Sequence, residues 1–209
     1  MKSEEEIKKA LDELRKEKTR KFNQTVDLIV NLQKFDAKKT PINIFVSIPH
    51  KIKEKKIAAF LETKNKDVET ITKDSFKRYS DKKELKRLSK NFDFFIAQAN
   101  LMPSVATSFG RVLGPMGKMP SPQMGVIVNA DEKTIKEIKE KISNIIRVRV
   151  KEGSLKLAIG KQDMKDEDIA ENIISVYNAL VKALPKGIEN VKNVEIKLTM
   201  TKPKKINMK

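Results

Sequence analysis

The sequence predicts an α/β protein of two domains, one of which is discontinuous. Apolar residues recur with a period of two in some segments and with helical spacing in others. Residues 56–146 contain a complete alternating series of strands and helices, whereas the flanking segments 1–55 and 147–209 are each too small to form a stable domain. Joined together, the two ends make a two-layer α/β sandwich. The middle is then inserted as a three-layer α/β (Rossmann-like) domain.

The N-terminal segment supplies one helix and two strands. Residues 3 to about 18 show an apolar stripe at helical spacing, and Ser3 with Glu6 forms a capping box that satisfies free N–H groups at the helix start. Residues 22–32 and 42–48 carry apolar side chains at every second position. This alternation predicts two half-buried strands.

A lysine-rich linker at 51–56 leads into the middle of the chain, where strands and helices alternate. The predicted elements are, in order, a strand at 57–61, a helix at 81–90, a strand at 92–97, a helix at 102–112, a strand at 125–128 and a helix from 131. Strands that alternate with helices pair in parallel, because each helix carries the chain back across the sheet. The middle domain should therefore be a parallel sheet with helices on its faces.

Residues 113–125 interrupt this regular pattern. Three prolines and three glycines fall within these thirteen positions, although the whole chain has only eight prolines and seven glycines. Proline removes a backbone donor, and glycine is favoured where the backbone needs unusual dihedral angles. The stretch therefore predicts a fixed irregular loop and argues against a helix or an ordinary strand.

The last third returns to the first domain. Its predicted elements are strands at 147–150 and 155–159, a helix at 166–184, a strand at 193–200 and a basic tail at 202–209. The tail has four lysines and no acidic residue. No internal repeat is present.

Composition indicates a polyanionic partner. The chain has 45 Lys and Arg against 28 Asp and Glu, which gives a formal net charge of +17. Such a surface repels itself, and its usual partner is nucleic acid; the charge alone does not separate RNA from DNA. A membrane surface is disfavoured because no basic amphipathic helix with bulky aromatics is present, and no apolar run approaches a membrane span. Without cysteine or an apolar leader, the chain is expected in the cytoplasm.

The residue inventory argues against an enzyme, a metal site and a cofactor site. His50 is the only histidine and there is no cysteine, so the common zinc and thiol sites are excluded. The pair Gly117-Lys118 does not complete a phosphate-binding loop, because Val112 and Met119 stand where that motif needs Gly and Ser or Thr. The acidic cluster at 166–168 lies at a predicted helix start, where acids complement the helix dipole.

RNA binding is the remaining chemical hypothesis, and the start of the first strand supports it. Lys21 can meet a phosphate, Phe22 can lie against a sugar or base, and Gln24 and Thr25 offer hydrogen bonds to 2′-hydroxyls. The alternative is that Phe22 simply opens the core face of the strand. A second basic segment, 197–202, closes the last strand and could equally be an ordinary strand end.

The run Gly110-Arg-Val-Leu-Gly-Pro-Met-Gly-Lys-Met-Pro-Ser-Pro122 resembles the hallmark segment of the large-subunit ribosomal protein L1 family, in its archaeal or eukaryotic style. The resemblance covers essentially the whole chain. It implies that both termini form an RNA-binding domain and that 56–146 forms the insert. For the 113–125 loop itself, two interpretations stay open: a structural loop of the insert, or a contact with rRNA.

The resemblance also implies a function. Members of the family bind the stalk helices of large-subunit rRNA, help deacylated tRNA leave the exit site, and in many cases repress translation by binding a stalk-like structure in their own mRNA. The chain is expected to be a non-enzymatic ribosomal component in the cytoplasm, monomeric when free. The alternative is a general nucleic-acid-binding or ribosome-assembly protein without stalk specificity.

Site residues follow from two further matches. Residues 22–27 look like the family's Phe-x-x-Ser/Thr-Val-Glu/Asp segment, and 198–200 resembles its Thr-Met-Gly turn. The RNA-contact role implied by the resemblance carries to Lys21, Phe22, Gln24, Thr25, Thr199 and Met200. Lys156 and Lys161 are further predicted contacts, since 160–161 also resembles a family segment, and Thr201 is predicted as an RNA contact beside Met200. His50 and Lys51 fall at the predicted hinge.

One position departs from the family pattern. Thr201 stands where glycine is usual, and a β-branched residue resists a positive φ angle. Either the turn at this position is not left-handed, or the RNA contact is looser.

Overall fold

The computed structural model describes residues 2–17, 20–37, 39–65, 68–79, 81–122, 124–128 and 131–208. The chain divides into two compact units, one formed by Met1–Ile52 with Asn144–Lys209 and the other by Lys53–Ser143. The predicted boundaries at 55/56 and 146/147 fall close to these. The predicted helix end near residue 18 and the last tail residue, 209, lie outside the described residues.

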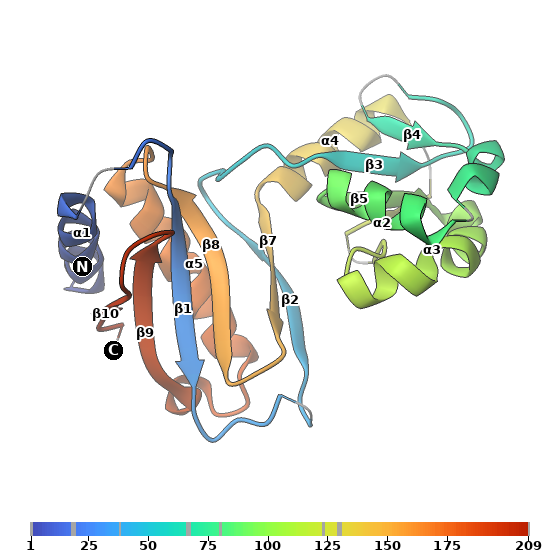
Figure 1. Ribbon diagram of the computed structural model, residues 1–209. Helices are drawn as coiled ribbons and strands as arrows, with labels where there is room; N and C mark the ends of the chain where they lie inside the picture. Colours follow the sequence, from blue (N-terminus) through green and yellow to red (C-terminus); the bar gives the residue numbers. More distant parts are fainter. Residues whose placement is uncertain are drawn as a thin grey trace. The chain divides into compact units, whose positions relative to one another are not determined.

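The first unit contains helices α1 (Lys2–Lys16) and α5 (Asp166–Ala183), a short 3-10 turn η3 (Gly187–Asn190), and strands β1 (Thr25–Leu32), β2 (Ile42–Ser47), β7 (Ile145–Val150), β8 (Ser154–Lys161), β9 (Val191–Leu198) and β10 (Lys204–Ile206). Four strands form an antiparallel sheet in the order β10-β9-β1-β8, and β2 pairs with β7. Figure 1 shows β1, near the start of the chain, lying between β8 and β9, near its end. The two termini therefore build one sheet.

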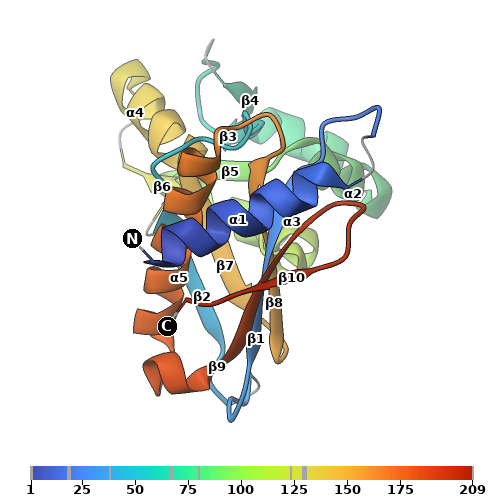
Figure 2. The same cartoon turned by 90° about the vertical axis from the view of Figure 1, so that its left-hand side faces the viewer.

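Two helices pack on one face of this sheet. Alternate residues of β1, among them Leu28 and Val30, join a single buried cluster with Leu11 of α1 and Ile173 of α5. Figure 2 shows α1 crossing in front of the strands and α5 standing to their left. The first unit is thus a two-layer α/β sandwich, and the predicted α/β class is confirmed.

The second unit contains β3 (Ile57–Phe60), β4 (Glu69–Ile71), η1 (Lys73–Tyr79), α2 (Lys82–Asn91), β5 (Phe94–Gln98), η2 (Ala99–Leu101), α3 (Met102–Met116), β6 (Val126–Ile127) and α4 (Glu132–Ser143). Its sheet is parallel in the order β4-β3-β5-β6. Along β3, Ala58 and Phe60 pack in a cluster with α2 and α3, whereas Ile57 and Ala59 pack with α4. Because successive strand residues face opposite sides, the sheet lies between two helix layers.

Several predicted elements need correction. Helix α1 begins at Lys2, ahead of Ser3, so the capping box is wrong. The Glu6 carboxylate instead accepts a hydrogen bond from the backbone N–H of Asn207 at 2.7 Å. Strand β6 is shorter than predicted: it comprises Val126–Ile127, and Val128 after it is 78% exposed.

The predicted loop at 113–125 is wrong for its first four positions. Helix α3 continues to Met116 and contains Pro115 in its last turn. The helix ends just after this proline, where Gly117 adopts a left-handed φ of 70° and caps the helix with bonds to the carbonyls of Leu113 and Gly114.

The basic tail is also more ordered than its composition indicates. Residues of β10 pair antiparallel with β9, with Lys204 opposite Ile196 and Ile206 opposite Val194. Ile206 is buried in the core of the first unit. One apolar residue among lysines was too weak a signal for a strand.

Candidate nucleic-acid interface

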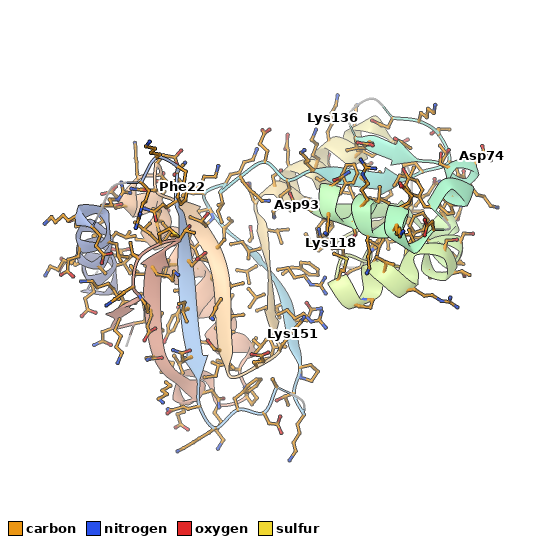
Figure 3. All side chains as sticks on the ribbon, viewed as in Figure 1. Phe22, Asp74, Asp93, Lys118, Lys136 and Lys151 are labelled. Carbon is orange, nitrogen blue, oxygen red and sulfur yellow. The ribbon has the colours of Figure 1, made fainter. Side chains whose placement is uncertain are left out.

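Three chain segments meet at one end of the first unit's sheet. The start of β1, the end of β8 and the end of β9 are adjacent, because Thr25 pairs with Lys161 and Val26 pairs with Leu198. Sequence segments 21–25 and 197–202, predicted separately as RNA contacts, therefore lie together. Figure 3 labels Phe22 at this end of the sheet.

Two large apolar side chains are exposed here. Phe22 precedes β1 and is 51% exposed, and Met200 follows β9 and is 58% exposed. The interpretation of Phe22 as the first core residue of the strand is thus wrong. Exposed aromatic and methionine side chains beside lysines offer a surface on which a sugar or base can lie.

Side-chain hydrogen bonds extend the pairing of β1 and β9 beyond the regular sheet. The Thr199 hydroxyl accepts from the Thr25 backbone N–H at 3.0 Å and lies 3.4 Å from the Thr25 carbonyl oxygen. The Met200 backbone N–H donates to Oε1 of Gln24 at 3.1 Å. The segment that carries Met200 is therefore tied to the segment that carries Phe22.

Gln24 serves as a support in this arrangement. Its side chain is 2% exposed, and besides Met200 its amide approaches the Gln162 side chain at 3.4 Å. A group this buried is not available to a 2′-hydroxyl, so the predicted direct contact of Gln24 with RNA does not fit the structure. Thr25 is half-buried, and Lys21 and Thr199 are exposed.

Thr201 closes the turn that follows β9. Its backbone N–H donates to the Leu198 carbonyl at 3.1 Å, and its hydroxyl accepts from the Leu198 N–H at 2.9 Å. Among the described residues, Lys34 is the one non-glycine residue with positive φ. The turn is consequently not left-handed at Thr201, which decides between the two alternatives for this position.

The predicted lysines separate into two places. Lys161 pairs with Thr25 at the end of the sheet, whereas Lys156 pairs with Ile29, four residues further along β1 and so roughly 13 Å away. Lys197, which begins the predicted basic segment 197–202 but is not among the individually predicted contacts, lies opposite Asp27. Burial raises the pKa of the Asp27 carboxyl, and Lys197 opposes this shift. The register of β1 and β9 places Lys197 opposite Asp27, and composition alone does not predict strand register.

Comparison with known proteins places the chain in a family. The model of the "Ribosomal protein L1p/L10e family" matches residues 14–202. The chain is 37% identical to "Large ribosomal subunit protein uL1" of Nanoarchaeum equitans, over 96% of this chain and 97% of that protein. It is 37% identical to the protein of the same name in Thermococcus kodakarensis, with 88% of each chain covered, and 36% identical to that of Methanobrevibacter smithii, with 94% and 96% covered. The chain belongs to the ribosomal protein L1 family.

In this L1-family chain the first residue of the predicted hinge, His50, is held by hydrogen bonds to helix α5. The His50 backbone N–H and carbonyl both bond the side-chain amide of Asn172 in α5, each at 3.0 Å, and Nε2 of its ring lies 2.8 Å from the Glu171 carboxylate. His50 is therefore part of the first unit, and the change of unit comes after Ile52. Lys51, between His50 and Ile52, is exposed.

The family's hallmark loop has a structural role in the second unit. The Lys118 ammonium donates to the carbonyls of Ser89 at 2.7 Å and Phe92 at 2.6 Å, at the C-terminal end of α2. Burial lowers the pKa of Lys118, and nearby Asp93 opposes this shift. Figure 3 labels Lys118 and Asp93. A cation at the end of a helix also complements its dipole.

Gly125 closes the same loop where no side chain fits. A Cβ atom there would lie 3.0 Å from the Phe95 carbonyl oxygen and 3.2 Å from Cα of Pro120. The Gly125 carbonyl accepts from the Ala97 N–H at 2.7 Å, which attaches the loop to β5. These contacts favour the structural interpretation of the loop.

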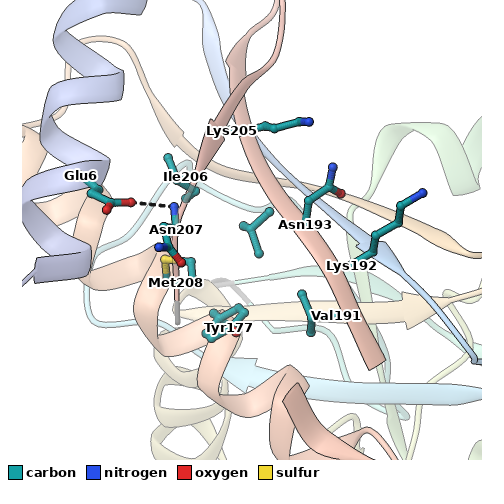
Figure 4. Close-up of a pocket in the computed structure, with 10 residues that line it drawn as sticks. Glu6, Tyr177, Val191, Lys192, Asn193, Lys205, Ile206, Asn207 and Met208 are labelled. Carbon is teal, nitrogen blue, oxygen red and sulfur yellow. Dashed lines mark hydrogen bonds between the residues drawn. The ribbon is translucent and has the colours of Figure 1, made fainter. Parts of the chain in front are cut away.

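A cavity of about 400 Å³ lies where the chain leaves β10. Figure 4 shows ten residues that line it: Glu6, Tyr177, Val191, Lys192, Asn193, Val194, Lys205, Ile206, Asn207 and Met208. Its walls are largely apolar. The one carboxylate in its lining, that of Glu6, already accepts a hydrogen bond from the Asn207 backbone N–H. The lining contains no pair of nucleophile and base. Across the described residues no cluster of potential metal ligands occurs, and no helix there is long and apolar enough to cross a membrane.

Proposed function

We propose that this chain is a structural protein of the large ribosomal subunit that binds the stalk helices of its rRNA through the end of the β10-β9-β1-β8 sheet. Membership of the L1 family and the "Large ribosomal subunit protein uL1" relatives support this assignment. The net charge of +17 supplies phosphate attraction that weakens with salt. Its place of action is the cytoplasmic ribosome.

The observation that carries the proposal is that the exposed side chains Phe22 and Met200 come from two segments joined by hydrogen bonds. The two side chains come from segments tied together through Thr25 and Thr199. Two exposed apolar side chains near lysines can contact the sugars and bases of a folded RNA and so contribute recognition that charge alone cannot supply. In this proposal Phe22, Met200, Thr25 and Thr199 make close contacts, Lys21 and Lys161 bind phosphates at the same end, and Lys156 binds further along.

The resemblance to the family implies two finer roles, and we propose that both use the same site. On the ribosome, the stalk-bound protein assists release of deacylated tRNA from the exit site. Off the ribosome, the same surface binds a stalk-like structure in its own mRNA and represses translation. Both roles need the RNA-binding end of the first unit, and they are tested separately by tRNA release from reconstituted subunits and by translation of a reporter that carries the mRNA leader.

A salt-series titration tests the proposal. It compares a stalk fragment of large-subunit rRNA with an unrelated structured RNA of equal size and with a DNA duplex. We expect a preference for the stalk of about 10³ or more that persists as salt rises. Similar affinities that fall together with salt would instead indicate a general nucleic-acid-binding protein.

A further inference from the structure

We propose that Gln24 and Thr201 are positioning residues that hold the turn of Met200 in its RNA-binding shape before RNA arrives. This inference rests on the proposed function, because it assigns to Met200 a contact with RNA. Neither positioning residue needs to touch RNA. Their effect is to fix the backbone from which Met200 projects.

The turn is held by side chains at both ends of its backbone. Oε1 of Gln24 accepts the Met200 N–H at 3.1 Å, and the Thr201 hydroxyl accepts the Leu198 N–H at 2.9 Å and lies 3.3 Å from the Leu198 carbonyl oxygen. Strand β10 pairs with β9 only as far as Ile196, so it does not reach Leu198. At the end of the sheet these two side chains therefore accept backbone hydrogen bonds, as a neighbouring strand does along the rest of the sheet.

Gln24 connects all three segments of the site. It is 2% exposed at the start of β1, its carbonyl accepts from the Gln162 N–H at 2.8 Å beyond β8, and its side chain holds Met200 beyond β9. An amide is costly to bury unless its hydrogen bonds are made. A polar side chain on the core face of this strand is therefore explained by the bonds it makes across the site.

A preset turn strengthens binding, because ordering a loop at the moment of association reduces affinity. We call the two hydrogen bonds that Gln24 and Thr201 accept from the turn the clasp. If these bonds are removed, Met200 stays exposed but its backbone is no longer held in one position. Stalk binding should then weaken although no contact atom has been removed. The loss should appear without a matching loss of global stability.

The test compares Thr201→Val, which keeps the shape and removes the hydroxyl, with Thr201→Ser, which keeps the hydroxyl. Gln24→Met is a second variant that removes the other acceptor. Thr107→Val is the matched control, since among the described residues the Thr107 hydroxyl bonds the Pro103 carbonyl, within α3. Three quantities are measured: the Kd for the rRNA stalk fragment at fixed salt, hydrogen exchange of the Met200 amide in the free protein, and the midpoint of thermal unfolding.

We expect Thr201→Val and Gln24→Met to bind the stalk about five- to tenfold more weakly, as loss of one hydrogen bond implies, with faster exchange at Met200 and an unfolding midpoint lowered by no more than about 4 °C. Thr201→Ser and Thr107→Val should behave as wild type. Wild-type Kd and exchange in both test variants overturn the inference, as does failure of serine to rescue.

Met200→Ala separates this inference from the proposed function. If Met200→Ala weakens binding and the two clasp variants do not, the inference fails and the proposed site stands. If Met200→Ala and Phe22→Ala both bind as wild type, the proposed site itself is wrong and the inference falls with it.

Discussion

Excision of the second unit should leave a folded, RNA-binding first unit. The two crossing points lie side by side, because the Ile48 N–H donates to the Asn144 carbonyl at 2.7 Å and β2 pairs with β7 as far as Ser47 opposite Ile145. The chain from Ile48 to Ile52 spans at most about 14 Å. A linker of roughly five Gly and Ser residues therefore suffices to join Ile52 to Asn144.

The expected affinity of the excised protein follows from its charge. Residues 53–143 contain 19 Lys and Arg and 12 Asp and Glu, so excision removes +7 of the +17 and leaves +10. The proposed contact residues all remain. We therefore expect specific stalk binding within about tenfold of the full chain, and a larger loss for unrelated RNA, because non-specific affinity depends on charge alone.

The assay combines far-UV circular dichroism, thermal unfolding and the salt-series titration of the excised protein. A cooperative transition with retained stalk preference is the expected result. An excised protein without cooperative unfolding would show that the first unit depends on the second. A folded protein that binds stalk and unrelated RNA equally would refute the assignment of recognition to the end of the sheet.

Three further predictions are more local. Phe22→Ala and Met200→Ala should each weaken stalk binding by about 1–3 kcal/mol in a titration, with Val128→Ala as a control for loss of an exposed apolar side chain in the second unit. Lys118→Met should lower the free energy of unfolding in urea by about 2 kcal/mol, since two carbonyls of α2 lose a charged donor, whereas Lys86→Met on the exposed side of α2 should change it little. Because the folded pKa of Lys118 is lowered, wild type should gain stability relative to Lys118→Met as pH rises toward 10.5, the value of an exposed lysine; a pH-independent difference would contradict this.

Much of the fold follows from local pattern. Alternation in 42–48, the continuous apolar run of 57–61 and the helical stripe of 166–184 correspond to β2, β3 and α5. The discontinuous arrangement also follows, because neither end of the chain holds enough apolar surface alone. Such predictions succeed where one physical requirement, burial of an apolar face, decides the structure.

Elements fixed by distant partners were not predictable in the same way. Strand β10 exists because β9 offers an edge and the core accepts Ile206, and neither fact is visible in a lysine-rich tail. Pro115 argues locally against a helix, yet α3 contains it and runs on to Met116. In both cases the tertiary context outweighed the local preference.

The candidate site shows where a closer use of the same rule would have succeeded. Gln24 shares the parity of Val26 and Leu28, so strict alternation places it on the core face, yet its polarity suggested an RNA contact. A polar residue at a core position of a strand end is better understood as a hydrogen-bond support. By that argument the residues most important to the shape of an RNA site include buried ones, and mutagenesis limited to exposed basic and aromatic residues would measure the contacts while missing what holds them in place.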